Sequence, residues 1–396
     1  MITLKTNGKD VIEIDESVIT KILDIYPDEH LADRPLFLEA RKLEVLTYAE
    51  LRAECDKLLI PWQLFLLSPT RLKKEIGKIE EKRKSKFDKV MIASRDNEGH
   101  GVSLRIADRL IALQDFARQG INEKNNFCGS LKSVHRDKWA EQLLKHFEIN
   151  PAKLSNGRKE KTLEYLIGKL EEKDIRVSRG VLTNKLLPAA NAIRSSYRKS
   201  SGFVVQDSKV PYVFLPNEVS DNETPGRQIL TLLSLLILIG LNQYNLYITG
   251  DLETRIGGNR TLNQIYGVVS EILLPFEATD KLRGVQITED VRDDLASRYM
   301  LTPSAIIVTL RQRGLIEDDT TYQSLLDGIP KGNGSKATKR TPHLDTAVRK
   351  LCGNATSNDI INGLRSHTLT SVQAQYMMFG RVDKLKFEKY KANVGL

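Results

Sequence analysis

The most constraining feature of this sequence is an apolar stretch, residues 229–241, in which only Thr231, Ser234 and Gly240 are not hydrophobic. Thr224, Pro225 and Gly226 stand just before it and are typical of a helix start. A helix that is apolar on every side must be buried on every side. The stretch is shorter than the roughly 20 residues that cross a bilayer, so we expect a core helix and no membrane partner.

The segments around this helix predict a small sheet. Residues 173–178 and 209–216 have the short, β-branched and aromatic character of strands, and both precede the apolar stretch. The segments outside this region show mainly helical periodicity, as in residues 137–147. We therefore expect an α+β fold that is mostly helical, with a small sheet packed on the buried core helix.

The motifs in this region resemble those of ImmA/IrrE-type zinc peptidases. They are Ser201-Gly-Phe-Val-Val-Gln-Asp, Val210-Pro-Tyr-Val-Phe-Leu and Gly226-Arg-Gln-Ile-Leu-Thr-Leu. In that family Thr-Leu is followed by one residue and then by His-Glu-x-x-His. The two imidazoles hold zinc, and the glutamate acts as base on the zinc-bound water.

Aligned on that motif, this chain has Ser234 and Leu238 at the histidine positions and Leu235 at the glutamate position. The family's third ligand falls near Leu262, counted back from Pro275. Residues 224–250 contain no His, Asp, Glu or Cys in any register. The resemblance thus implies a pseudo-peptidase with no catalytic residues, no metal and no cofactor, although a core helix in an unrelated helical protein is the open alternative.

The basic character of the chain suggests an anionic partner, and DNA is one candidate. The net charge is +9 and the pI is about 9.2, a balance that also suits a merely solvated surface. The candidate nucleic-acid contacts are Lys82, Arg83, Lys84, Lys86, Arg194, Arg198, Lys199, Arg311 and Arg313. The alternatives are a solvated helix with pairs such as Glu75–Lys78, and packing of the helix that carries Arg311.

A relocated active site is a further hypothesis. Asp96, Glu98 and His100 lie together in a polar segment and are the only candidates for it. A turn rich in Asn and Gly explains the same residues without any catalytic role.

The organisation expected along the chain has six parts. These are a helical region with an Xre-like remnant (1–120), a helical connector (121–172), the degenerate peptidase-like domain (173–285), a helix-turn-helix-like pair (286–328), a linker (329–342) and a helical C-terminal region (343–396). Within the remnant, Thr47 and Glu50 form a predicted capping box. Cys55, Cys128 and Cys352 are widely separated, and no export signal is visible, so we expect a cytoplasmic protein without disulfides.

The family that the chain resembles suggests a function. Its members are typically encoded beside Xre-type repressors in phages and mobile elements, and they relieve repression by cleaving the repressor. A member without zinc ligands implies a regulatory protein that binds a repressor-type partner or DNA without cutting it. The alternative is a nucleic-acid-binding regulator, or a phage-defence component, that uses the peptidase-like core as a scaffold.

Overall fold

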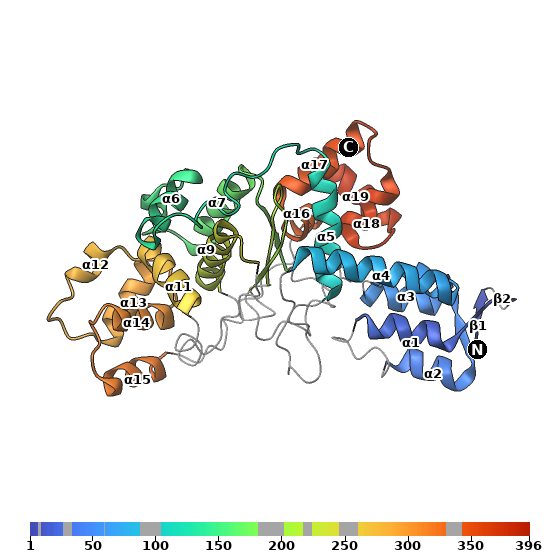
Figure 1. The fold of residues 1–396 in the computed structure, drawn as a ribbon, viewed down its shortest axis with the longest axis horizontal. Coiled ribbons are helices and arrows are strands. Elements are labelled where there is room, and N and C mark those ends of the chain that lie inside the picture. The colour runs from blue at the N-terminus through green and yellow to red at the C-terminus, as the bar shows by residue number, and fades with distance from the viewer. Residues whose placement is uncertain are drawn as a thin grey trace.

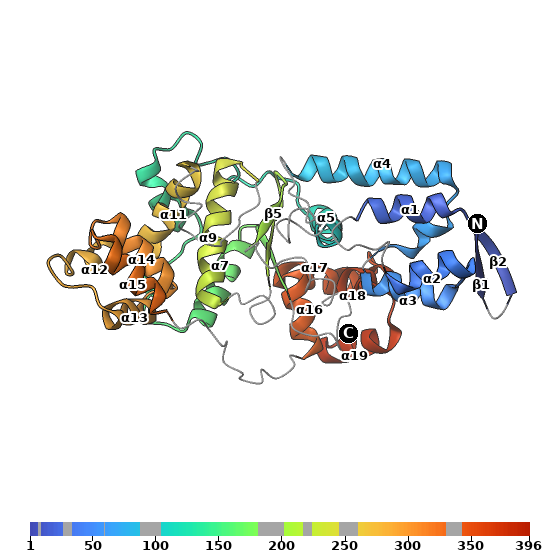
Figure 2. The ribbon, with the colours of Figure 1, turned by 90° about the horizontal axis from the view of Figure 1, so that it is seen from below.

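The computed structural model describes residues 1–6, 9–26, 34–58, 60–87, 104–180, 202–216, 224–244, 260–329 and 343–396. It is mostly helical with two three-stranded sheets, which confirms the predicted α+β class. The molecule is elongated, with residues 1–87 at one end, residues 260–329 at the other, and the second sheet between them (Figures 1 and 2). None of the helices described is long and apolar enough to span a membrane.

Residues 1–87 form a part with its own hydrophobic core. Its sheet has β1 (Ile2–Thr6) in the centre, antiparallel to β2 (Lys9–Ile14) and parallel to β3 (Val45–Thr47). The helices of this part are α1 (Glu16–Asp24), α2 (Pro35–Leu43), α3 (Tyr48–Leu58), the 3₁₀ helix η3 (Trp62–Leu66) and α4 (Pro69–Lys86). Three short strands, which were not predicted from the sequence, therefore stand beside the helices of this region.

The N-terminus of α3 confirms the predicted capping box. The backbone N–H of Glu50 donates to the hydroxyl of Thr47 over 3.2 Å, and the N–H of Thr47 donates to the carboxylate of Glu50 over 3.3 Å. Each side chain thus satisfies a helix donor that has no partner within the helix.

The second sheet lies at the centre of the molecule. Its strands are β4 (Arg176–Arg179), β5 (Phe203–Val205) and β6 (Tyr212–Leu215), in the order β4-β6-β5. The central strand β6 runs parallel to β4 and antiparallel to β5, so it pairs along both of its edges. The strand predicted at 173–178 is present but shifted to 176–179, and the strand predicted at 209–216 is present as the shorter β6.

Both faces of this sheet are covered. Val204 and Val213 point into a core shared with α7 (Lys159–Glu171) and α9 (Pro225–Leu241). The alternating residues Phe203, Tyr212 and Phe214 point into another core, which contains α5 (Leu104–Arg118) and the C-terminal helices. Because side chains alternate along a strand, one short sheet joins the two cores.

Helix α9 is the predicted core helix. Thr224 caps it by accepting a hydrogen bond from the N–H of Arg227, and Pro225 occupies its first turn. Every residue from Gln228 to Leu241 is buried. Asn242 ends the helix in the left-handed conformation, with φ of 56°. Figure 2 shows α9 standing beside the sheet, with α7 next to it.

Gly240 lets α9 pack closely on the segment before α6 (Trp139–His146). A Cβ at position 240 would lie 2.6 Å from Cδ1 of Leu131 and 3.1 Å from the ring of Phe127, and both neighbours are buried. We expect Gly240→Ala to destabilise the protein by about 1–3 kcal/mol, because overpacking outweighs the better helix propensity of alanine.

The matched control for that substitution is Gly77→Ala in α4. Nothing lies within 4 Å of a Cβ at this exposed position, so the same change should stabilise α4 by up to about 1 kcal/mol. Urea unfolding of both variants measures the difference. An unchanged or raised midpoint for Gly240→Ala would contradict the close packing.

The far end of the molecule consists of short helices that share the core of α9. They are α11 (Arg260–Leu273), α12 (Phe276–Asp280), α13 (Glu289–Arg298), α14 (Pro303–Gln312) and α15 (Asp319–Asp327). Thr288 and Thr302 cap α13 and α14, and Gly314 follows α14 with φ of 70°. The predicted helix pair at 286–328 therefore packs on the core that contains α9, in agreement with the packing alternative for the helix that carries Arg311.

The C-terminal region is bound to the sheet. Its helices are α16 (Leu344–Cys352), α17 (Asn354–Arg365), α18 (Ser371–Phe379) and α19 (Lys384–Val394). The hydroxyl of Ser178 in β4 donates to the carbonyl of Leu351 over 2.6 Å, and Arg176 pairs with Asp359 over 3.2 Å. Residues 343–396 thus complete the core on one face of the sheet, while residues 330–342 of the predicted linker lie outside the described residues.

Candidate functional site

The three positions aligned with the zinc-binding motif lie inside the core. Ser234, Leu235 and Leu238 are at most 2% exposed on α9. The hydroxyl of Ser234 donates to the carbonyl of Leu230, one turn earlier in the helix, over 2.8 Å. Leu235 and Leu238 pack in the cluster that joins α9 to α7 and α11. These side chains act in packing and offer no base and no metal ligand.

The backbone that leads into β5 passes close to the same helix. A Cβ at Gly202 would lie 3.1 Å from both Leu235 Cδ1 and Thr231 Cγ2, and 2.6 Å from the carbonyl oxygen of Phe214. Only glycine allows so close an approach. The backbone at Gly202 therefore packs directly against Leu235.

The fourth aligned position, Leu262, lies on α11 and is half-buried against the same core. Helix α11 packs on α9, so the positions of the aligned ligands belong to two touching helices. Among the described residues, no three His, Cys, Asp or Glu side chains gather in an arrangement that could hold a metal ion. His146 is half-buried beside Phe127 and Phe147, and burial, followed by the charge of Lys173, lowers its pKa.

Two of the basic candidates on α4 are buried in ion pairs. The guanidinium of Arg83 donates to both carboxylate oxygens of Asp108, over 2.7 and 2.6 Å, and to the carbonyl of Ile25 over 3.0 Å. It also lies over the ring of Tyr26. Arg83 is 7% exposed, so the prediction that it contacts phosphate is corrected: it joins α4 to α5 and to the end of α1.

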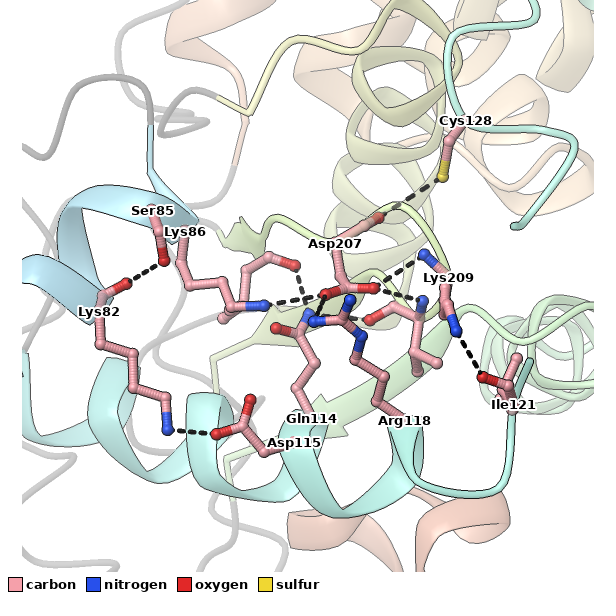
Figure 3. A network of polar contacts seen from close by, with 12 residues as sticks. Lys82, Ser85, Lys86, Gln114, Asp115, Arg118, Ile121, Cys128, Asp207 and Lys209 are labelled. Carbon is pink, nitrogen blue, oxygen red and sulfur yellow. Dashed lines mark hydrogen bonds and ion pairs between the residues drawn. The ribbon is translucent and has the colours of Figure 1, made fainter. Parts of the chain in front are cut away.

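Lys86 is the second corrected candidate, because its ammonium lies 2.9 Å from the carboxylate of Asp207 and both side chains are almost fully buried (Figure 3). The backbone N–H groups of Lys209 and Val210 donate to the other oxygen of Asp207, and Arg118 lies 3.5 Å away. Burial by itself raises the pKa of Asp207, but the hydrogen bonds from Lys86 and from the two backbone N–H groups outweigh burial and lower it. This network holds the end of α4 against the turn between β5 and β6.

Gln114 of α5 also contacts the turn between β5 and β6. Its side-chain amide is fully buried and donates to the carbonyls of Val205 and Val210, over 2.9 and 2.8 Å (Figure 3). Helix α5 thus holds both sides of the β5–β6 turn. Neither Asp207 nor Gln114 was singled out from the sequence. The position of Asp207 two residues before the predicted strand at 209–216 was the one available signal, since an aspartate side chain in a turn commonly accepts from backbone N–H groups two residues further on.

The remaining candidates on α4 are at the surface. Lys82 is exposed and pairs with Asp115 of α5, and Lys84 is exposed. Lys78 pairs with Glu75 over 2.7 Å, as the solvated-helix alternative predicted. Arg71, Lys73 and Lys74 are exposed on the same helix. The surface of α4 is therefore basic without Arg83 and Lys86.

The two arginines near the end of α14 contact the protein itself. Arg311 pairs with Asp319 and lies over the ring of Tyr322. Arg313 donates to the carbonyl of Leu274 over 2.6 Å and to the hydroxyl of Thr279 over 2.8 Å, and burial lowers its pKa. Arg313 is thus corrected from a nucleic-acid candidate to a residue that satisfies the last carbonyls of α11.

The other candidates lie outside the described residues. They are Arg194, Arg198 and Lys199 for nucleic acid, and Asp96, Glu98 and His100 for a relocated active site.

No protein-family model, curated protein or solved structure matches the chain.

Proposed function

We propose that this chain is a non-catalytic relative of ImmA/IrrE-type zinc peptidases and acts by binding a repressor-type partner without cutting it. The observation that carries this proposal is the burial of Ser234, Leu235 and Leu238 in one continuous core, with the backbone at Gly202 packed against Leu235. A small sheet, a core helix and a second packed helix follow one another in the order that the resemblance implies.

The chemistry of these positions supports binding in place of hydrolysis. Peptide hydrolysis of this type needs a metal-bound water and a carboxylate base within hydrogen-bond reach. Leu235 occupies the position of the base, and leucine cannot accept a proton. A partner could still recognise the outer surface of the domain, because recognition depends on shape and polar contacts outside the core.

The test uses the full chain and an Xre-type repressor encoded in a neighbouring gene. The two purified proteins are mixed with zinc, and their association is followed by size-exclusion chromatography and calorimetry. We expect a stable complex in which the repressor remains intact. Cleavage of the repressor, or the absence of any complex at micromolar concentrations, would reject the proposal.

A second candidate function, binding of nucleic acid, rests on the exposed lysines of α4. Changing Lys73, Lys74 and Lys84 to glutamine removes three charges from one helix face. A plot of the logarithm of the DNA-binding constant against the logarithm of salt concentration falls with a slope of about 0.9 per phosphate contact. If all three lysines contact phosphates, the slope of the triple variant should be shallower than that of the wild type by up to about 2.7.

The matched control changes three exposed lysines elsewhere, Lys281, Lys384 and Lys389, to glutamine. Fluorescence anisotropy with a duplex at several salt concentrations measures both variants. Equal slopes for the wild type and the α4 variant would remove α4 as a nucleic-acid surface.

A further inference from the structure

Four cations form a line along α4. Arg71, Lys74, Lys78 and Lys82 are exposed and recur at intervals of three or four residues, so they lie along one side of the helix. Because the helix rises about 1.5 Å per residue, these charges follow one another at steps of about 4.5–6 Å. A row of regularly spaced cations suits a polymer that carries regularly spaced anions, as a nucleic-acid strand does.

Lys82 is the last cation of this line, and it already has an anionic partner within the protein. Its ammonium pairs with the carboxylate of Asp115 on α5 (Figure 3). The side chains of Lys82 and Asp115 are 48% and 38% exposed, so another molecule can reach both of them. An exposed ion pair of this kind contributes little to the stability of the fold. Lys82 can therefore exchange one anion for another while the fold stays intact.

A neighbouring ion pair between the same two helices shows the contrast. Asp108 lies seven residues before Asp115, on the same side of α5. Asp108 pairs with Arg83, which is only 7% exposed, so an outside anion cannot reach that guanidinium. Helix α5 thus offers two carboxylates to α4. The carboxylate of Asp108 holds the two helices together, and the carboxylate of Asp115 can be displaced.

We propose that Asp115 competes with the phosphates of DNA for Lys82 at the surface of α4. In the free protein the carboxylate of Asp115 occupies Lys82. A phosphate must displace this carboxylate before Lys82 can join Arg71 and Lys74 on a DNA strand. The inference rests on the second candidate function, the binding of nucleic acid by α4, and adds the contact that limits it.

Fluorescence anisotropy of the full chain with a DNA duplex at several salt concentrations tests this competition. Asp115→Asn keeps the shape of the side chain and releases Lys82, so one more phosphate contact should form. The plot of the logarithm of the binding constant against the logarithm of salt concentration should become steeper by about 0.9. At about 0.1 M salt this change corresponds to binding that is up to about eightfold tighter. An unchanged slope would overturn the proposal.

A comparison in a second background separates competition for Lys82 from a general effect of charge. Asp115→Asn removes one negative charge, and this change alone favours DNA. In a Lys82→Gln background the same substitution has no lysine to release, so the slope should not become steeper. Equal steepening in both backgrounds would show that Asp115 does not act through Lys82, and the proposal would be rejected.

The matched control is Glu388→Gln on α19. Glu388 is exposed and pairs with Lys391 over 2.8 Å, so this substitution also removes one negative charge and releases one lysine. Because the released lysine is not on α4, the slope should remain that of the wild type. A steeper slope for Glu388→Gln, equal to that of Asp115→Asn, would contradict a specific role for α4.

Failure of this inference can be distinguished from failure of the function on which it rests. If the α4 triple variant has a shallower slope than the wild type but Asp115→Asn has the same slope, α4 binds DNA and only the competition is rejected. If neither the wild type nor Asp115→Asn binds the duplex, both are rejected. Thermal unfolding should give the same midpoint for the wild type and Asp115→Asn, since the pair is exposed. A clearly lower midpoint would show that the pair is a fixed part of the fold, against the proposal.

Discussion

Leu235→Glu is expected to unfold the central domain. Leu235 is 0% exposed on α9, inside an apolar core and close to Thr231 and to the backbone at Gly202. The change removes the packing of a buried leucine, which costs about 2–5 kcal/mol, and buries a carboxyl group in this apolar core. The total approaches the 5–15 kcal/mol stability of a typical protein.

Thermal unfolding followed by circular dichroism measures this effect. The matched control is Leu385→Glu, because Leu385 is 86% exposed on α19 and the same substitution there should leave the midpoint nearly unchanged. Leu235→Met is the conservative control and should cost less than about 1.5 kcal/mol. A folded Leu235→Glu protein with the wild-type midpoint would show that this position faces an open, polar site.

Asp207→Asn is expected to have the second largest effect. The substitution leaves the buried ammonium of Lys86 without its counter-charge, 2.9 Å away in the wild type. Removing one partner of a buried ion pair typically costs about 3–5 kcal/mol. Arg118 loses the same partner, but it is half-exposed and can turn toward solvent, so most of the cost falls on Lys86. Urea unfolding should show a loss of about 3 kcal/mol.

The control for Asp207→Asn is Glu75→Gln, which breaks the exposed pair with Lys78 and should cost less than about 1 kcal/mol. The acid side of the pH profile provides an independent check. Because the folded state lowers the pKa of Asp207 below its ordinary value of 3.8, its contribution is complete well above that value and is lost as the pH falls through the folded pKa. The wild type and Asp207→Asn should therefore begin to converge in stability as the pH falls below 3.8, and should converge fully only once the pH is below the folded pKa. A difference that stays constant with pH would contradict the ion pair.

The sequence predicted those helices whose position depends only on residues close together in the chain. Helix α9 was predicted because a run without charged residues, in which only Thr231, Ser234 and Gly240 are not hydrophobic, is stable as a helix only when it is buried on every side. The start of α3 was predicted because capping needs only Thr47 and Glu50, three residues apart. The strands β1, β2 and β3 were missed, since a strand of three to six residues has too short a pattern to be distinguished from a helix segment.

The fate of the basic residues could not be predicted, because it depends on contacts between distant parts of the chain. Arg83 and Lys86 belong to one basic run, but their partners Asp108 and Asp207 lie 25 and 121 residues further along. The charge composition identified α4 as a basic helix. It could not distinguish the basic residues of α4 that face solvent from those that bind α4 to other parts of the protein.

The most direct test of the central claim is anomalous diffraction at the zinc edge from crystals of the full chain grown with zinc. We predict that no peak lies between α9 and α11 near Ser234 and Leu238, because leucine packing occupies that position. A zinc peak there at coordination distance, about 2.0–2.3 Å from protein ligands, would contradict the proposal that the site has been refilled as core.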